Sequence, residues 1–489
     1  MRPCAFLAAG PVRRTDGGLG EAVYARRMSA EQLSALDSTF LELEQADGSA
    51  HMHIGAVLVF DPIPGRGAPT REQVLRRLGR RLPMLPRFRQ KLSEPSVSGL
   101  RRPHWVDDPG FDLKAHVGRA ALPAPGGDAE LLEWAGGFYS QRLDRRLPLW
   151  EFVFVEGLED GRWALATKLH HSLADGVGSL EMTTLFRDGV PATSGPPPVR
   201  AHDHPPAVAQ LLRAGFDVLR HPRHTAGQAE ALAQLIVREE LIAAPPCSLN
   251  VPIGEHRRLA VARTTLAEVA AIRRAFGGTV NDVVLTAVTS GLRDVLVARG
   301  EEPPKAGLRA MVPVNLRTED DGELGNRVLS RFVALPVDEA ELLQRHRRVV
   351  AAGRGAKHGH QPVGGATLIS LAEHLPPVLH LPLAQSVFGT RLFNVTVTNV
   401  PGPPGATRTF KARLADIVPV VPLAAEHAVG VAVISHAGRL TFCVNADRDT
   451  VPDASLVAAG ITQALEQLGA AVAAEVPASA APGGTGSGQ

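Results

Sequence analysis

A proline-rich stretch, SGPPPVRAHDHPPAV at residues 194–208, divides the sequence into two blocks that each mix short strands with helices. Proline lacks the backbone N–H that helices and central strands require, so such a cluster is typical of a connection between domains. The 489 residues are also too many for one ordinary hydrophobic core. We therefore expect an α/β protein with two α+β halves and mixed sheets, joined by a helical connector.

The expected boundaries follow changes of pattern along the chain. The glycine- and arginine-rich start shows no hydrophobic period, and the end, PASAAPGGTGSGQ, has the composition of a disordered tail. The predicted units are a flexible extension (1–28), a first domain (29–195), a Pro-rich and helical linker (196–250), a second domain (251–475) and a disordered tail (476–489).

Hydrophobic spacing predicts the elements inside the two blocks. In the helix expected at 71–83, the leucines fall on one face and the arginines on the other, and we interpret the basic face as solvated surface. The predicted strands are 51–61, 162–171, 308–314, 392–399, 428–435 and 440–446, and the other predicted helices are 207–220, 226–243, 281–299, 339–352 and 455–473.

Composition excludes several classes of function. A formal charge of +2 over the whole chain gives no reason to expect nucleic acid as a partner. Three widely separated cysteines form no CxxC or Cys/His spacing, so neither a disulfide framework nor a metal site is predicted, and no cofactor is expected. No run of eighteen apolar residues occurs, so no transmembrane helix is predicted and a cytoplasmic protein is expected.

The segment RWALATKLHHSLADGVG (162–178) has the clearest chemical logic. An apolar strand ends at His170 and His171, and a tight turn follows. Neighbouring strand residues point to opposite faces, so one histidine is expected to be chemical and the other structural. In the turn, Asp175 is placed to bond backbone or an arginine, and Gly176 permits a backbone geometry that a side chain hinders. Taken alone, two histidines at a strand end are equally compatible with a purely structural turn.

The pattern HHxxxDG at residues 170–176, together with other segments, resembles the bacterial wax ester synthase/diacylglycerol acyltransferases, a branch of the HHxxxDG superfamily that includes chloramphenicol acetyltransferases. The similarity covers about residues 28–470. Val251 stands where this family usually has Gly, and Thr398 where Ser is common. The other segments are SALDSTFLELE (34–44), RLPLWEF (146–152), SLNVPIGEHRRLA (248–260), TVNDVVLTAV (279–288), MVPVNLR (311–317), GNRV (325–328) and FNVTVTNVPGPP (393–404).

The resemblance implies two chloramphenicol-acetyltransferase-like halves with the active site at their interface. It implies that His171 is the general base, taking the proton of an acceptor hydroxyl that then attacks an acyl-CoA directly. Histidine suits this role because its unperturbed pKa lies near neutrality. Asp175 is implied to be structural and paired with an arginine, for which Arg87 and Arg89 in LPRFRQKL remain alternatives.

Asn281 and Asp282 match the ND motif of the family and admit two interpretations. A direct role toward substrate is one. The other is purely structural, because Asn and Asp at the start of a predicted helix favour capping and the positive end of the helix dipole.

Two further segments carry candidate substrate-binding or motif residues. Pro148, Leu149 and Trp150 match the family's PLW motif, although a buried core cluster explains them equally well. Asn394 and Asn399 are expected near the interface between the halves, and edge-strand polar residues before a Pro/Gly turn are the alternative.

The implied partners are acyl-CoA and a lipid alcohol. Diacylglycerol, giving triacylglycerol, is preferred over a long-chain alcohol, giving a wax ester, and contact with a membrane or lipid droplet is expected. The basic segment 341–357 and the proline-broken apolar segment 368–388 form an interfacial patch in one interpretation and buried helices in the other. Two rival functions are a same-fold acyltransferase acting on a secondary-metabolite alcohol and an inactive lipid-binding protein.

Overall fold

A computed structural model describes residues 33, 35–94, 103–174, 185–190, 244–315, 328–358, 392–403 and 405–475. Several predictions therefore lie outside the described residues. These are the extension at 1–28, the helices at 207–220 and 226–243, the apolar segment 368–388 and the tail at 476–489.

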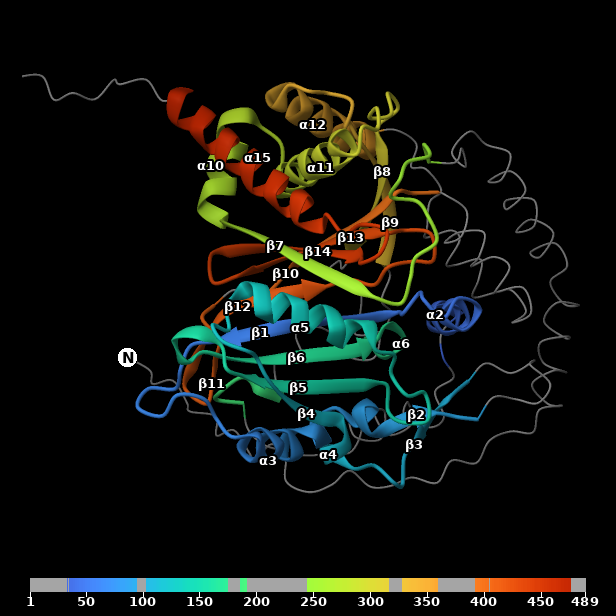
Figure 1. The fold of residues 1–489 in the computed structure, drawn as a ribbon, viewed down its shortest axis with the longest axis vertical. Coiled ribbons are helices and arrows are strands. Elements are labelled where there is room, and N and C mark those ends of the chain that lie inside the picture. Colours follow the sequence, from blue (N-terminus) through green and yellow to red (C-terminus); the bar gives the residue numbers. More distant parts are fainter. Residues whose placement is uncertain are drawn as a thin grey trace, which may run out of the picture.

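Two six-stranded sheets form the framework and lie one above the other in Figure 1. All neighbouring strands of the first sheet are antiparallel except β4 and β5. The first sheet has the order β11 (Arg408–Thr409), β12 (Ala412–Val420), β1 (His53–Phe60), β6 (Trp163–His170), β5 (Trp150–Glu156) and β4 (Val117–Ala121). The second has the order β7 (Arg257–Thr265), β14 (Arg439–Asp447), β13 (Val429–His436), β10 (Val395–Pro401), β8 (Leu308–Asn315) and β9 (Val328–Leu335).

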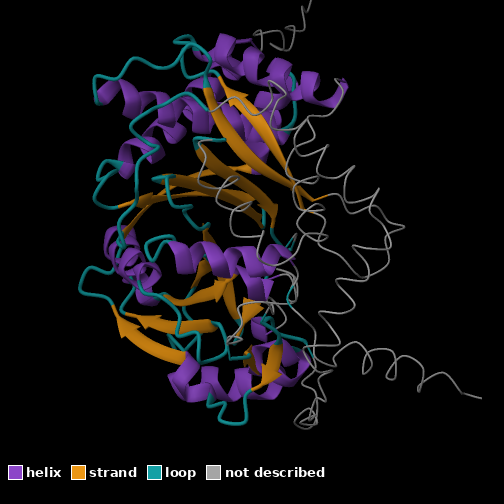
Figure 2. Ribbon diagram, turned by 90° about the vertical axis from the view of Figure 1, so that its right-hand side faces the viewer, coloured by secondary structure: helices purple, strands orange, loops and turns teal. Residues whose placement is uncertain are grey.

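The helices cover the sheets on several sides. Those of the second half gather on the face of its sheet that points away from the first half (Figures 1 and 2). They are α10 (Leu266–Phe276), α11 (Val280–Ala298), α12 (Leu342–His358) and α15 (Ala454–Glu475). The first half has α2 (Ala35–Ala46), α3 (Arg71–Arg81), α4 (Leu113–His116), α5 (Asp128–Ser140) and α6 (His171–Ala174), with a small β2 (Gln90–Leu92) and β3 (Trp105–Asp107) ladder and short 3₁₀ turns η1 (Leu82–Met84), η2 (Pro86–Arg89) and η3 (Glu159–Gly161).

Strand β5 shows how the sequence builds two cores on one sheet. Trp150, Phe152 and Phe154 pack into one hydrophobic cluster, and the intervening Val153 and Val155 pack into another. This alternation is what a strand buried on both faces requires, because side chains point to opposite sides at successive residues.

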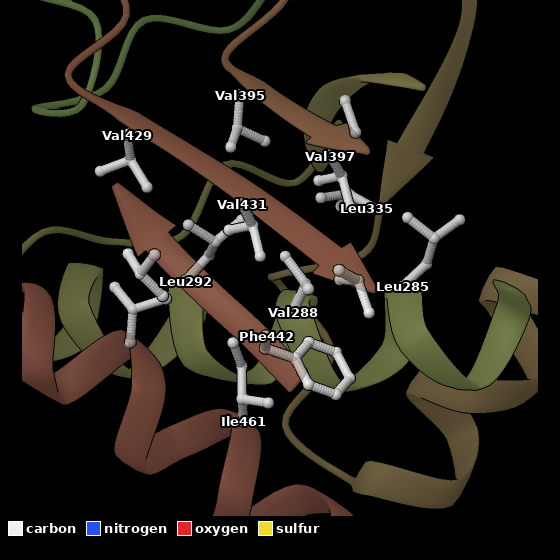
Figure 3. Packing of buried hydrophobic residues seen from close by; sticks show 14 of the residues in the cluster. Leu285, Val288, Leu292, Leu335, Val395, Val397, Val429, Val431, Phe442 and Ile461 are labelled. Carbon is white, nitrogen blue, oxygen red and sulfur yellow. The ribbon is translucent and has the colours of Figure 1, made fainter. Parts of the chain in front are cut away.

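The core of the second half is built around the crossing of α11 and α15 over the sheet (Figure 3). Gly291 makes the crossing close: a Cβ on it would lie 2.2 Å from the carbonyl oxygen of Val457. Residues 454–474 of α15 are long and apolar enough to span a membrane by composition, with a mean hydropathy of 1.3. Leu465 and Leu468 on this helix lie in the same buried cluster, which is the role of a core helix.

The arginine face of α3 is solvated only in part: Arg76 and Arg80 are exposed as predicted, but Arg77 and Arg81 have partners in the fold. Arg81 is only 7% exposed, and its guanidinium donates to the carbonyl oxygens of Leu185 and Arg187 at 3.2 and 2.6 Å. Arg77 pairs with Asp188 at 2.6 Å. Arg77 and Arg81 therefore fasten residues 185–190 to the first half, and sequence periodicity cannot show that such partners exist.

The expected domain boundaries also need a correction. Residues 408–420 were assigned to the second domain, but β12 pairs with β1 in the first sheet, with Val57 opposite Val418. Two strands that follow the second half's β10 in the chain, β11 and β12, thus complete the first sheet. The reason is physical: the edge of β1 is otherwise an unpaired row of backbone donors and acceptors.

Candidate active site

The two histidines lie where β6 ends. His170 is the last residue of β6 and stands opposite His53 of β1, and His171 is the first residue of α6. Their backbone is fixed from both neighbouring strands, because the His170 N–H donates to Leu149 O at 3.0 Å and the His171 N–H donates to Met52 O at 2.7 Å. The pair is therefore held at one end of the first sheet, beside α2 (Figure 1).

His170 occupies a structural position. Its ring is 1% exposed, and its Nδ1 accepts the backbone N–H of Ser172 at 3.1 Å, with the Ser172 hydroxyl also 2.7 Å away. Since Nδ1 accepts, the proton resides on Nε2, which donates to Glu44 Oε2 at 3.1 Å. Burial lowers the pKa of His170, although Glu44 opposes this effect, so the ring is neutral at neutral pH. Both ring nitrogens are engaged, which leaves no site for accepting a substrate proton.

His171 occupies a different environment. The side chain is half-buried, and its ring centroid lies 4.1 Å from that of Phe40 on α2. Phe40 belongs to the hydrophobic cluster that contains the core of the second half. The imidazole of His171 therefore stands at the seam between the halves, and of the two histidines it is the one in a position to meet a substrate.

The remainder of the motif lies outside the described residues, since these stop at Ala174; Asp175 and Gly176 follow. Their predicted roles are therefore not addressed by contacts. Of the two candidate arginine partners, Arg87 bonds Gln90 Oε1 at 3.1 Å and lies over the ring of Trp105. Arg89 lies over the ring of Phe111, 5.6 Å from its centroid.

The PLW segment forms part of the core. Trp150 is 1% exposed, its indole N–H donates to Phe88 O at 2.8 Å, and its ring lies 4.5 Å from that of His116. Leu149 is fully buried, and the Pro148 carbonyl accepts the Trp150 N–H at 2.8 Å. These contacts favour the core interpretation, and they also set the register of β5 beside His170.

The two residues of the ND segment separate in role. Asp282 completes a capping box at the start of α11: its Oδ2 accepts the Thr279 N–H at 2.8 Å, and its own N–H donates to Thr279 Oγ1. Asn281 contacts another candidate site residue of the same half, because Asn399 Nδ2 donates to Asn281 Oδ1 at 3.4 Å. The structure therefore assigns capping to Asp282 and brings Asn281 and Asn399 together.

Asn394 is positioned differently from the expectation. It is fully buried and precedes β10, where its Nδ2 donates to Pro245 O at 2.8 Å and to Asn250 Oδ1 at 2.6 Å. Its Oδ1 accepts the Arg309 N–H at 2.7 Å. These bonds tie the end of the linker to the second sheet, and they favour the structural alternative for Asn394.

Two residues of α2 next to the histidines were missed by the sequence reasoning, namely Phe40 and Glu44. Their spacing of four residues places them on one helical face, but only the folded chain shows that this face meets the histidines. No cluster of three or more His, Cys, Asp and Glu side chains suited to a metal ion occurs within the described residues.

The two mixed sheets, with the histidine pair at the end of the first, form a fold of the two-domain condensation-domain-like class. The profile of the wax ester synthase/diacylglycerol acyltransferase catalytic domain matches residues 33–284, and that of the WS/DGAT C-terminal domain matches residues 324–469. The chain belongs to the wax ester synthase/diacylglycerol acyltransferase family and is an O-acyltransferase of that family.

Individual proteins agree with this assignment. The chain is 37% identical to a probable diacylglycerol O-acyltransferase of Mycobacterium tuberculosis over 448 residues, covering 89% of this chain and 95% of the relative. It superposes on the wax ester synthase/diacylglycerol acyltransferase of Marinobacter aquaeolei VT8 with a TM-score of 0.65 and 28% identity, covering 91% of this chain and 100% of the other. A starter condensation domain of rhizomide synthetase, at 14% identity and a TM-score of 0.51 over 94% and 97% of the chains, shares the fold.

Proposed function

We propose that the protein transfers a long-chain acyl group from acyl-CoA to the free hydroxyl of diacylglycerol, forming triacylglycerol and CoA. The observation that carries this proposal is the half-buried His171 at the seam, next to a His170 whose two ring nitrogens are both engaged. The names of the mycobacterial relatives support diacylglycerol as the main acceptor. The name of the Marinobacter enzyme supports long-chain alcohols, giving wax esters, as a second acceptor class.

In the proposed mechanism, His171 removes the proton of the acceptor hydroxyl while the oxygen attacks the thioester carbonyl carbon. The tetrahedral intermediate collapses with cleavage of the C–S bond, and the protonated imidazole returns its proton to the sulfur of CoA. The thioester is already activated, so no acyl-enzyme is required. Positioned proton transfer of this kind contributes about 10²–10⁴-fold to the rate.

We also propose that the enzyme works at a lipid surface as a peripheral protein, because diacylglycerol is held in membranes and droplets. The first five residues of the predicted basic segment 341–357 include Arg345, which is buried and bonds Ser290 Oγ at 2.6 Å. That arginine belongs to the interior, whereas Arg347 and Arg348 of the same segment are exposed and can face a lipid surface. Sedimentation with diacylglycerol-containing vesicles tests this part directly.

The test of the reaction is a panel of acceptors offered to purified protein with labelled acyl-CoA: diacylglycerol, hexadecanol and small polar alcohols. A His171→Ala variant is expected to lose about 10²–10⁴-fold in kcat. His256→Ala serves as the matched control, since His256 is exposed and its side chain lies on the surface of the second half. Unchanged turnover in His171→Ala refutes the base assignment. Turnover of small alcohols alone favours the secondary-metabolite alternative, and lipid binding without any turnover favours the binding-protein alternative.

A further inference from the structure

Helix α2 presents two side chains, one turn apart, to the two histidines. The Phe40 ring contacts His171 with 4.1 Å between ring centroids, and Glu44 accepts the Nε2–H of His170 at 3.1 Å. Residues four apart lie on the same face of a helix, so a single element touches both members of the pair. The acyl-transfer mechanism above gives Glu44 no role, although its side chain is only 2% exposed.

We propose that Glu44 is a positioning residue for acyl transfer, which acts through His170 to hold His171 in its reactive orientation. This inference rests on the proposed role of His171 as general base. Glu44 itself contacts neither substrate nor the reacting atoms in this proposal. It orients the His170 ring, and that ring caps the turn that carries His171.

The route from Glu44 to His171 consists of hydrogen bonds and one short helix. The carboxylate holds the proton of His170 on Nε2, which leaves Nδ1 free to accept the N–H of Ser172 at 3.1 Å. Ser172 directly follows His171 in α6, a helix of four residues. A single helical turn is not stable by itself, since its nucleation costs more than one hydrogen bond returns. Its orientation therefore depends on the cap that His170 supplies.

The wrong tautomer of His170 breaks this route. A proton on Nδ1 would face the N–H of Ser172, and Nε2 would face the carboxylate with a lone pair. Both of these contacts would be repulsive, and only the Ser172 hydroxyl, 2.7 Å from Nδ1, could accept the misplaced proton, so we expect the turn that carries His171 to shift. The carboxylate of Glu44 thus selects one of two neutral forms of a buried ring, in the way that a group bonded to one ring nitrogen sets the role of the other.

The surroundings of Glu44 keep it ionised and held in place. Burial raises the pKa of the carboxyl, but the hydrogen bond from His170 and the charges of Arg145 and Arg142 outweigh it, so the pKa lies below its ordinary value. The Arg142 and Arg145 guanidinium nitrogens lie 3.5 and 3.9 Å from the carboxylate, and His53 Nε2 lies 3.9 Å from it.

The contacts of Arg142 and Arg145 with α2 do not depend on the Glu44 carboxylate alone. Arg142 donates to the Glu44 backbone carbonyl at 3.2 Å and Arg145 to the Leu41 carbonyl at 2.8 Å. Their contacts with α2 therefore survive when the side chain is changed to an amide. For this reason we expect a Glu44→Gln variant to fold.

The experiment is a double-mutant cycle between Glu44→Gln and His170→Asn, with kcat, the KM for diacylglycerol and the thermal midpoint measured for each variant. The Asn side-chain oxygen replaces Nδ1 as acceptor for Ser172 but does not reach Glu44. Glu44→Gln alone is expected to lower kcat roughly 10- to 100-fold with KM changed less than about twofold, since misplacement of a reacting group by 1 Å costs on the order of 10²-fold. In the His170→Asn background the same change is expected to cost less than about twofold.

Glu151→Gln is the matched control. Glu151 pairs with the fully buried Lys168 at 3.0 Å on the same sheet but has no contact with the histidine pair among the described residues. This variant is expected to lower the thermal midpoint and leave kcat unchanged. Unchanged kcat in Glu44→Gln, or an equal loss in both backgrounds, overturns the inference. The inference is also overturned if Glu151→Gln loses as much kcat as Glu44→Gln for the same decrease in thermal midpoint.

A second measurement needs no turnover. In protein labelled with ¹⁵N-histidine, His170 is expected to show the Nε2–H tautomer in the wild type and a mixture in Glu44→Gln. An Nδ1–H form in the wild type overturns the inference. The failure of the proposed function looks different, because it appears as activity that persists in His171→Ala.

Discussion

Replacing Trp150 by Phe tests whether the PLW segment acts on substrate or only supports the core. The indole is 1% exposed, and its N–H donates to Phe88 O at 2.8 Å. The ring also stacks on His116 with 4.5 Å between centroids. Phenylalanine retains an aromatic face for this stack, but it removes the hydrogen-bond donor and part of the ring.

The expected loss of stability has two parts. The Phe88 carbonyl is left without its donor in a buried position, which costs about 1–3 kcal/mol. The smaller ring leaves a cavity of roughly 40 Å³, which costs about 1 kcal/mol if the surroundings do not relax. We therefore expect the free energy of unfolding to fall by about 2–4 kcal/mol.

The assay is urea unfolding followed by circular dichroism, together with steady-state kinetics at a temperature where the variant stays folded. Because the indole lies in the core, kcat and KM are expected to stay within about twofold of the wild type. Trp134→Phe is the control, since Trp134 is half-buried on α5 and stacks on Phe138. If Trp150→Phe loses activity while its unfolding curve is unchanged, the core interpretation is refuted.

Three further predictions concern the second half. Burial lowers the pKa of His427 from 6.5 to about 4, so the folded state resists protonation and stability is lost as the pH falls from about 6.5 toward 4. Between pH 7 and pH 5 this residue is expected to account for a loss of about 2 kcal/mol in the free energy of unfolding. Urea unfolding of His427→Asn at the two pH values should no longer show this loss. Asp282→Ala removes the capping box of α11 and is expected to cost about 0.5–2 kcal/mol in thermal unfolding, whereas Asp282→Asn, which keeps an acceptor, should cost less; equal losses would contradict the capping role. Gly291→Ala places a Cβ 2.2 Å from the Val457 oxygen and should lower stability by at least about 1–3 kcal/mol, and an unchanged melting temperature would show that the helix crossing can widen freely.

Hydrophobic spacing within a segment was enough to predict elements whose own residues carry the signal. The alternation in 440–446 and the helical spacing in 281–299 reappear as β14 (Arg439–Asp447) and α11 (Val280–Ala298). Strand β12 was missed as a member of the first sheet because its partner β1 lies more than 350 residues earlier in the chain. Nothing in the composition of a strand shows which of two sheets it joins.

The same limit applies to the site. The strand period predicted that only one of the adjacent histidines faces a substrate, and the contacts of His170 agree with that division. The capping alternative for Asp282 followed from its place at a helix start. The contact of Glu44 with His170 joins residues 126 positions apart, so it was beyond the reach of spacing arguments.

The pairing of β11 and β12 with the first sheet affects how the chain reaches its native state on the ribosome. The first half has all of its other strands once residue 170 has been synthesised, but the open side of β1 stays unpaired until residue 420 has left the exit tunnel. Through that interval a nascent chain exposes a strand edge that favours aggregation. A fragment that ends before residue 408 is therefore expected to be insoluble, and the two halves should unfold in one cooperative step.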